Sequence, residues 1–365
     1  MNFKRTGSIL TIAAVGTMLL ASCAANEGGS GTSTDGASSD LSGEIAGIGA
    51  SSQQSAQEAW VTGFQTANPD VTINYDPQGS GGGRESFISG AAAFAGSDRA
   101  FKTDEISSST FAGCTPDTGI VELPAYVSPI AVIFNLDGVD ELNLSPATIA
   151  GIFSGAITTW DAAEIKADNP DATLPSTPIT AVHRSDDSGT TENFTEYLNA
   201  NSPDVWSSEP DGVWPLEGGE GANQTSGMID AVTNGTGTIG YADASRAGDL
   251  GVAKIKVGDE FVEYSAEAAA AIVDESPEEE GRTEGDIAIE LDRTSTAAGV
   301  YPLVLVSYLI GCESYEDAEQ GALVKSYFEY VTSEEGQQVA ADAAGSAPIS
   351  STLSGQVADA IALIK

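Results

Sequence analysis

Two hydrophobic periodicities alternate along the chain. Residues 45–48 and 71–75 show the two-residue alternation of strands, and the segment between them places Ala56, Trp60 and Phe64 on one face of a helix. Further strands are predicted at 94–98, 179–182 and 236–241, and extended apolar stretches at 121–135 and 300–310. Further helices begin near residues 80, 145, 188, 226 and 261 and cover 323–344. This order of strands and helices predicts an α/β fold.

Three of the predicted strands lead through small polar residues into a helix, at 49–52, 79–83 and 184–190. A helix N-terminus has backbone N–H groups without intrahelical partners and the positive end of the dipole, so it favours anions. Arg184 adds a planar fork suited to a tetrahedral oxyanion, and Asp186 is placed to hold that fork. The three turns together predict an anion site, although the third turn alone also fits an N-capped surface helix with a salt bridge.

Two long apolar stretches contain prolines. Pro124 and Pro129 interrupt residues 121–135, and Pro302 interrupts 300–310. Proline cannot donate to a sheet ladder and is rare in central strands. These stretches are therefore predicted to cross between two domains, a number that the length of 365 residues also suggests.

The N-terminus has the pattern of an export signal. Lys4 and Arg5 precede an apolar run at 9–20, which is too short for a spanning helix and ends at Leu-Ala-Ser-Cys23. This ending resembles the lipobox of bacterial lipoproteins. We therefore expect residues 1–22 to be a signal peptide and Cys23 to be the lipidated N-terminus, with 23–40 a flexible Gly/Ser-rich tether. The alternative is an ordinary signal peptide with a chance cysteine.

The composition limits the possible partners. The formal net charge is −40, so neither nucleic acid nor an anionic membrane is expected to bind through the overall field, and the membrane is reached through the lipid only. An anion site must then use close dipoles and a local cation. Cys114 and Cys312 most simply form one disulfide in an exported protein. With one histidine and no Cys-x-x-Cys, no zinc site and no metal or other cofactor is expected.

From about residue 41 onward the chain resembles the PstS family, the phosphate-binding lipoproteins of high-affinity phosphate ABC transporters, in its actinobacterial-type branch. The most specific match is 184–190, which fits the family pattern Arg-x-Asp-x-Ser-Gly-Thr. The resemblance implies that the ligand set and its support are Ser51, Ser52, Ser80, Asp98, Arg184, Ser188, Gly189 and Thr190, with Asp186 bracing the arginine. In this set Asp98 accepts the ligand's proton, and Ser52 replaces an aromatic residue of the family.

The resemblance also implies a type II periplasmic-binding-protein fold with two lobes and two hinge crossings. We place the crossings near 126–130 and 301–304, so that lobe one comprises 41–127 and 303–365 and lobe two comprises 128–302. The expected protein is a monomer on the extracytoplasmic face of the cell membrane. It binds inorganic phosphate and delivers it to the permease and ATPase subunits of a phosphate ABC importer.

Two rival functions are open to test. Ser188, His183 and Asp186 could belong to a hydrolase, but His183 would alternate to the face opposite Arg184, and no Gly-x-Ser-x-Gly elbow is present. The chain is therefore expected not to be an enzyme, and His183 to be structural. A sulfate or molybdate binder is the second rival; Asp98 disfavours it, because those ions carry no proton at neutral pH.

We predict that Cys23→Ser abolishes anchoring, because the only expected membrane attachment is the lipid on that sulfur. Fractionation and immunoblotting of the expressing cells should show the variant released into the medium or retained as an uncleaved precursor. Unchanged processing and membrane retention would rule out lipidation at Cys23.

Overall fold

The computed structural model describes residues 41–365. The predicted signal peptide (1–22), Cys23 and the tether (23–40) lie outside the described residues. Within residues 41–365, no helix is both long and apolar enough to cross a membrane.

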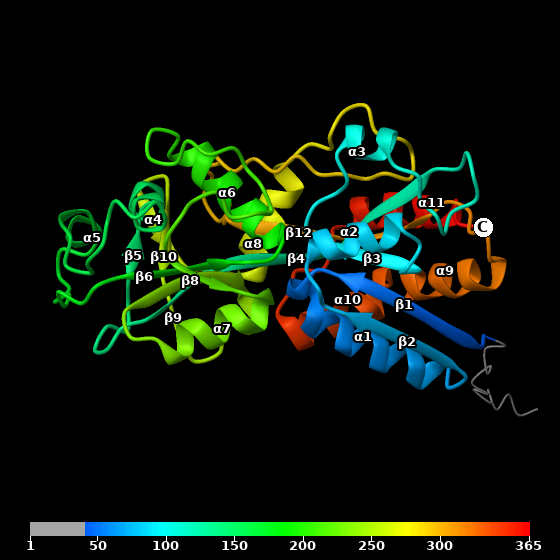
Figure 1. Ribbon diagram of the computed structural model, residues 1–365, viewed down its shortest axis with the longest axis horizontal. Coiled ribbons are helices and arrows are strands. Elements are labelled where there is room, and N and C mark those ends of the chain that lie inside the picture. Colours follow the sequence, from blue (N-terminus) through cyan, green and yellow to red (C-terminus); the bar gives the residue numbers. More distant parts are fainter. Residues whose placement is uncertain (1–40) are drawn as a thin grey trace, which may run out of the picture. The chain divides into compact units, whose positions relative to one another are not determined.

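A mixed nine-stranded sheet runs through the described chain in the order β2-β1-β3-β12-β4-β8-β6-β7, with β9 paired to β4 (Figure 1). A smaller three-stranded sheet has the order β11-β10-β5. The strands are β1 (Gly43–Gly49), β2 (Val71–Asp76), β3 (Phe94–Ser97), β4 (Ile120–Asn135), β5 (Asn143–Leu144), β6 (Thr180–Arg184), β7 (Glu220–Ala222), β8 (Thr238–Asp243), β9 (Gly251–Val252), β10 (Lys254–Val257), β11 (Glu260–Val262) and β12 (Val304–Cys312).

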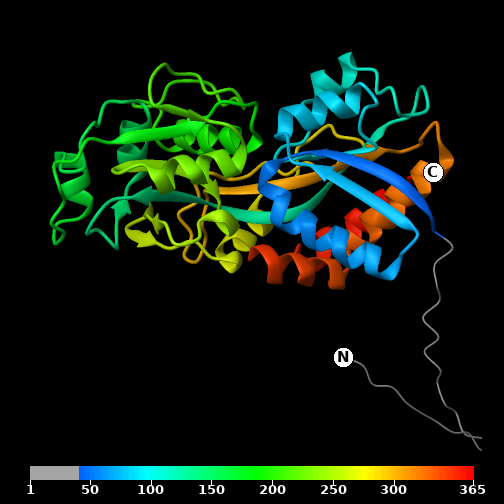
Figure 2. The same cartoon turned by 60° about the horizontal axis from the view of Figure 1, so that its bottom comes forward.

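Helices cover the sheet, and several of them begin directly after a strand. The α-helices are α1 (Gln54–Ala67), α2 (Ser80–Ile88), α3 (Thr103–Ser108), α4 (Pro146–Phe153), α5 (Ala163–Asp168), α6 (Gly189–Asn201), α7 (Gln224–Asn234), α8 (Ala266–Glu275), α9 (Ala318–Thr332), α10 (Glu334–Ala344) and α11 (Ser351–Ala362); η1 (Ser51–Gln53) and η2 (Ala244–Arg246) are 3₁₀ turns. Figure 2 shows the side on which α1 and α10 lie together, joined by the hydrogen bond from Trp60 Nε1 to the Gly336 carbonyl at 2.7 Å.

The fold has two lobes, and β4 and β12 run between them (Figure 1). β4 pairs antiparallel with β12 over 120–129 and with β8 over 130–135. Both strands are buried almost throughout, which explains their uninterrupted apolar sequence. The register shifts between Ser307 and Tyr308, opposite Pro124, so the proline falls at an irregularity of the ladder.

The helix predicted over 323–344 is wrong as one element, since the structure has α9 and α10 in its place. Ser333 adopts an extended conformation, and its hydroxyl caps α10 by accepting from the Gly336 N–H at 3.1 Å. The helix predicted from residue 261 also begins later. Phe261 lies in β11 opposite Lys256, and Ser265 caps α8. Capping and strand pairing outweighed helical periodicity at both places.

The division into lobes at 127/128 and 302/303 stays a prediction. Residues 277–289, which it assigns to lobe two, make several contacts with elements of the predicted lobe one. The Glu122 N–H donates to the Gly285 carbonyl at 2.9 Å, and the Ile289 N–H donates to the Tyr308 hydroxyl at 3.0 Å. These contacts favour moving that segment to lobe one.

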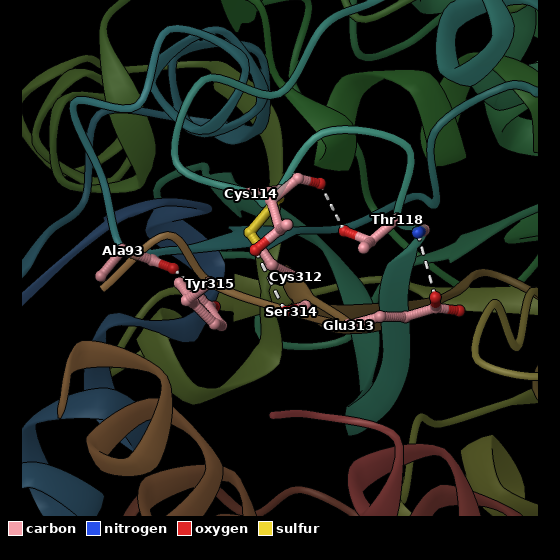
Figure 3. The surroundings of a disulfide bond; sticks show 9 residues. Ala93, Cys114, Thr118, Cys312, Glu313, Ser314 and Tyr315 are labelled. Atoms are coloured by element: carbon pink, nitrogen blue, oxygen red, sulfur yellow. Dashed lines mark hydrogen bonds between the residues drawn. A yellow bond between two sulfur atoms is a disulfide. The ribbon is translucent and has the colours of Figure 1, made fainter. Parts of the chain in front are cut away.

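Cys114 and Cys312 form a disulfide, as predicted, with their Cα atoms 5.3 Å apart (Figure 3). It joins the loop after α3 to the end of β12. Beside it the Tyr315 hydroxyl donates to the Ala93 carbonyl at 2.8 Å. The bond therefore connects segments 198 residues apart in the sequence.

We predict that this disulfide contributes substantially to stability, because a bond across 198 residues restricts the unfolded chain; the entropy model gives an upper value of roughly 5 kcal/mol. Non-reducing peptide mapping should recover the linked peptides, and reduction should lower the melting temperature. Two free, alkylatable thiols in protein purified under air would contradict the bond.

The carboxyl group of Asp243 lies fully buried at the end of β8, beside Tyr126 of β4. Burial raises its pKa to about 6, although hydroxyl groups that include those of Ser245 and Tyr126 donate to it. The folded protein therefore holds this proton at pH values where the unfolded chain, with a pKa near 3.9, has released it. The stability contribution of Asp243 is greatest below pH 4 and is lost as the pH rises through 6.

We expect Asp243→Asn to remove this pH dependence. The free energy of unfolding of the native protein relative to the variant should fall by roughly 3 kcal/mol between pH 4 and pH 7. Urea unfolding of both proteins across that range measures the difference. A difference that stays constant with pH would show that Asp243 is ionised in the native state throughout.

Candidate functional site

The three strand-to-helix turns, which follow β1, β2 and β6, meet beside Asp98, the residue after β3. The structure brings together all of the residues predicted for the site, which are Ser51, Ser52, Ser80, Asp98, Arg184, Asp186, Ser188, Gly189 and Thr190. All except Asp186 are buried. They come from β1–η1, the start of α2, the residue after β3 and the turn between β6 and α6, so the two predicted lobes face each other here.

Arg184 is almost fully buried and is held by a bidentate pair with Asp186. Its Nε donates to Asp186 Oδ1 at 2.7 Å, and its Nη2 donates to Oδ2. Asp186 also accepts from the Gln224 N–H at 2.9 Å, which fixes the carboxylate in turn. The Arg184 Nη2 reaches Ser51 Oγ at 3.2 Å across the lobes. The bracing contact that the sequence predicted is therefore present.

The Asp98 carboxylate accepts hydrogen bonds from hydroxyl groups of η1, β12 and α6. Its Oδ1 accepts from Ser52 at 2.6 Å and from Ser307 at 2.7 Å, and its Oδ2 accepts from Thr190 at 2.9 Å. A buried carboxylate is stable only when such donors satisfy it. Ser52 and Thr190, predicted as donors to an anion, direct their hydroxyl groups at Asp98 in this structure.

Glycines allow the turns to approach closely. A Cβ atom on Gly189 would lie 2.6 Å from Ser80 Oγ and 2.7 Å from Asp98 Cβ, so no side chain fits between α6 and the opposite lobe. Gly79 has φ of +100° before α2, a conformation that L side chains rarely adopt. The Ser188 hydroxyl caps α6 by accepting from the Thr191 N–H at 3.2 Å. The first N–H groups of α6 have no acceptor within their own helix and lie at this meeting point.

Sequence reasoning missed two hydroxyl residues of this cluster. Thr225, at the start of α7, contacts Ser51 Oγ through its Oγ1 at 2.9 Å and its N–H at 3.1 Å. Its signal was a fourth small polar stretch between a strand and a helix. Ser307 donates to Asp98 from the middle of β12. Its signal was a single small polar residue between large side chains of an otherwise apolar strand.

Ion pairs join the lobes at the rim. Glu192, in the first turn of α6, contacts Arg99 Nε at 2.7 Å and Lys102 Nζ at 3.3 Å. Arg99 also pairs with Glu105; burial opposes ionisation of Glu105, but the hydrogen bonds from Arg99 outweigh it and lower the pKa to about 2. A groove of about 550 Å³ adjoins Asp98 on this side, with Arg99 and Glu192 in its lining.

His183, which was expected to be structural, and Arg84 of α2 both make structural contacts. Both ring nitrogens of His183 face backbone carbonyls, Nδ1 that of Arg184 at 2.9 Å and Nε2 that of Gly218 at 3.1 Å, and the ring stacks on Trp214. Arg84 donates to Ser97 Oγ at 2.9 Å from within α2, and burial lowers its pKa. Within residues 41–365 no cluster of three His, Cys, Asp or Glu residues is arranged to hold a metal ion.

Comparisons with known proteins agree on one family. The family model of the PBP superfamily domain matches residues 31–335. The chain is 32% identical to phosphate-binding protein PstS 3 of Mycobacterium tuberculosis over 90% of this chain and 91% of that one, and 30% identical to PstS 2 of the same organism over 99% of both. The solved structure of a high-affinity periplasmic phosphate-binding protein (PfluDING) bound with phosphate has the same fold, with a TM-score of 0.68 at 22% identity, covering 86% of this chain and 93% of that one. The chain thus belongs to the PBP superfamily and, within it, to the family of PstS phosphate-binding proteins.

Proposed function

We propose that this protein binds inorganic phosphate, as HPO4 or H2PO4, between its two lobes outside the cytoplasm and delivers it to a phosphate ABC importer. The observation that carries the proposal is the buried juxtaposition of the Asp98 carboxylate with the braced Arg184 and the N-terminus of α6. Relatives named as phosphate-binding proteins over nearly the whole chain support the choice of anion.

The proposed ligand set divides by hydrogen-bonding role. Asp98 is the acceptor, because a carboxylate that faces an anion is repulsive unless a proton lies between them. Asp186 supports the site through Arg184. The donors are Ser51, Ser52, Ser80, Arg184, Ser188, Gly189 and Thr190, through side chains or backbone N–H groups. Neutral dipoles thus supply most of the interaction, which suits a chain of net charge −40.

The proposed setting follows from the N-terminal sequence. A lipid on Cys23 holds the monomeric protein at the extracytoplasmic face of the cell membrane, and the permease and ATPase subunits of the transporter are its partners. No cofactor and no nucleic acid enter this function.

Binding without catalysis fits the contacts of His183 better than a hydrolase does. In a Ser-His-Asp triad the histidine accepts the proton of the nucleophilic serine. Here both ring nitrogens face backbone carbonyls, and Ser188 caps α6. Absence of phosphatase turnover on simple phosphate esters is the expected result.

We predict that Arg184→Ala lowers phosphate affinity by at least about 30-fold. Removing one partner of a buried ion pair costs roughly 2–5 kcal/mol or more, because Asp186 is left unpaired beside the ligand. Isothermal titration of a domain without residues 1–40 measures the loss. Lys166→Ala, on the distant helix α5 and paired only at the surface with Asp161, is the matched control and should bind normally. A loss below tenfold would mean that the dipoles or another cation carry the site.

The anion itself is tested by titrating the same domain with phosphate, arsenate, sulfate and molybdate. Phosphate and arsenate carry the proton that Asp98 accepts, so both should bind, whereas sulfate should bind on the order of 10⁴-fold more weakly. Asp98→Asn removes the repulsion and can also donate, so it should narrow the difference between phosphate and sulfate. Comparable native affinities for the two ions, or an unchanged ratio in Asp98→Asn, would overturn the role of Asp98.

A further inference from the structure

A buried series of side-chain hydrogen bonds runs from Tyr327 of α9 to Asp98 in the candidate anion site. Gln53 Nε2 donates to Ser307 Oγ at 2.6 Å, and Ser307 donates to Asp98 Oδ1 at 2.7 Å. Behind Gln53, the Gln57 amide donates to Gln53 Oε1 at 2.8 Å, and the Tyr327 hydroxyl donates to Gln57 Oε1 at 2.7 Å. All five side chains are at most 3% exposed, so water does not compete for these bonds.

The donor and acceptor groups fix the direction of each hydrogen bond in this series. The Tyr308 carbonyl can only accept, and it lies 3.1 Å from Gln53 Nε2, so the amide nitrogen of Gln53 must face β12. Its oxygen then faces Gln57. Burial raises the pKa of Tyr327 well above the usual value, so this hydroxyl keeps its proton and begins the series as a donor. Every bond therefore points toward Asp98.

The position of Ser307 in β12 makes it the last donor. The register of β4 and β12 shifts between Ser307 and Tyr308, where β4 has an extra residue, Ala125. The carbonyl of Ala125 accepts from Gln337 Nε2 at 2.9 Å, which stabilises the irregularity. Such bulges change the direction of side chains along a strand. Here the register shift lies next to Ser307, whose side chain points toward Asp98.

The geometry points to Ser307, oriented by Gln53, as a positioning residue that keeps Asp98 a hydrogen-bond acceptor and thereby sets the preference for a protonated oxyanion over an unprotonated one. Because Gln53 donates to the Ser307 oxygen, the Ser307 hydroxyl directs its own proton to Asp98, its acceptor among the described residues. A carboxylate that Ser307 holds in place at Oδ1 accepts the proton of monohydrogen phosphate with its remaining lone pairs and repels the unprotonated oxygens of sulfate. This inference rests on the proposed function and names what determines its selectivity.

The test is the ratio of phosphate to sulfate affinity, measured by calorimetry on the domain without residues 1–40. Ser307→Ala should narrow that ratio by roughly 10- to 100-fold, because one hydrogen bond to a charged group is lost. Gln53→Met should narrow it by less, since Ser307 remains but is no longer oriented. Ser307→Thr keeps the hydroxyl group and should restore the native ratio.

Thr332→Ala is the matched control. It deletes a buried hydroxyl of α9 that donates to the Phe328 carbonyl at 2.8 Å and does not touch Asp98, so the ratio should be unchanged. Thermal melts verify that each variant is folded before its titration is compared. If the native protein discriminates but Ser307→Ala weakens both anions equally, the inference fails and the proposed function stands. If the native protein binds no phosphate, the proposed function fails first.

Discussion

The antiparallel pairing of β4 with β12 is the constraint on which the rest of the molecule depends. These strands occupy the middle of the large sheet, with β3 and β1 beyond β12 and β8 and β6 beyond β4. Each of the turns that form the candidate site follows a strand on one side of this pair, β1 and β2 on the side of β12 and β6 on the side of β4. The two strands also supply hydrogen-bond donors to buried carboxyl groups. Ser307 of β12 donates to Asp98, and Tyr126 of β4 donates to Asp243. The disulfide attaches to the last residue of β12.

A protein with 54 acidic and 14 basic residues cannot attract an anion at a distance. The cations near the site are moreover committed to carboxylates, Arg184 to Asp186 and Arg99 to both Glu105 and Glu192. Recognition must then rely on short-range dipoles, namely hydroxyl groups and the N-termini of helices, which act only once the ligand has lost its water. In the proposed function, such a site distinguishes anions by where they carry hydrogen rather than by their charge.

The two lobes meet through contacts that involve the same residues as the candidate site. Thr190 reaches Asp98, Arg184 and Thr225 reach Ser51, and Asn193 donates to the Asp98 carbonyl at 2.7 Å. Groups that would bind an anion thus also hold the lobes together, and binding and lobe contact are physically coupled. The rim pair of Arg99 and Glu192 adds a contact between the lobes outside this inner site.

The sequence by itself determined the local features: the α/β alternation, the three strand-to-helix turns and the bidentate partner of Arg184, two residues away. Periodicity, small residues and short loops act over a few positions, so a linear reading can find them. Only the tertiary structure decided which distant groups meet, as when Ser307 joins Asp98 across 209 positions and Thr225 joins Ser51 across 174. The tertiary structure also divides the helix predicted over 323–344 into α9 and α10. Ser333 caps the second helix, and the hydrogen bond from Trp60 of α1 to the Gly336 carbonyl holds that helix against α1. Hydroxyl residues have no periodic signature, because their partners are set by the packing of the whole chain and not by their neighbours in sequence.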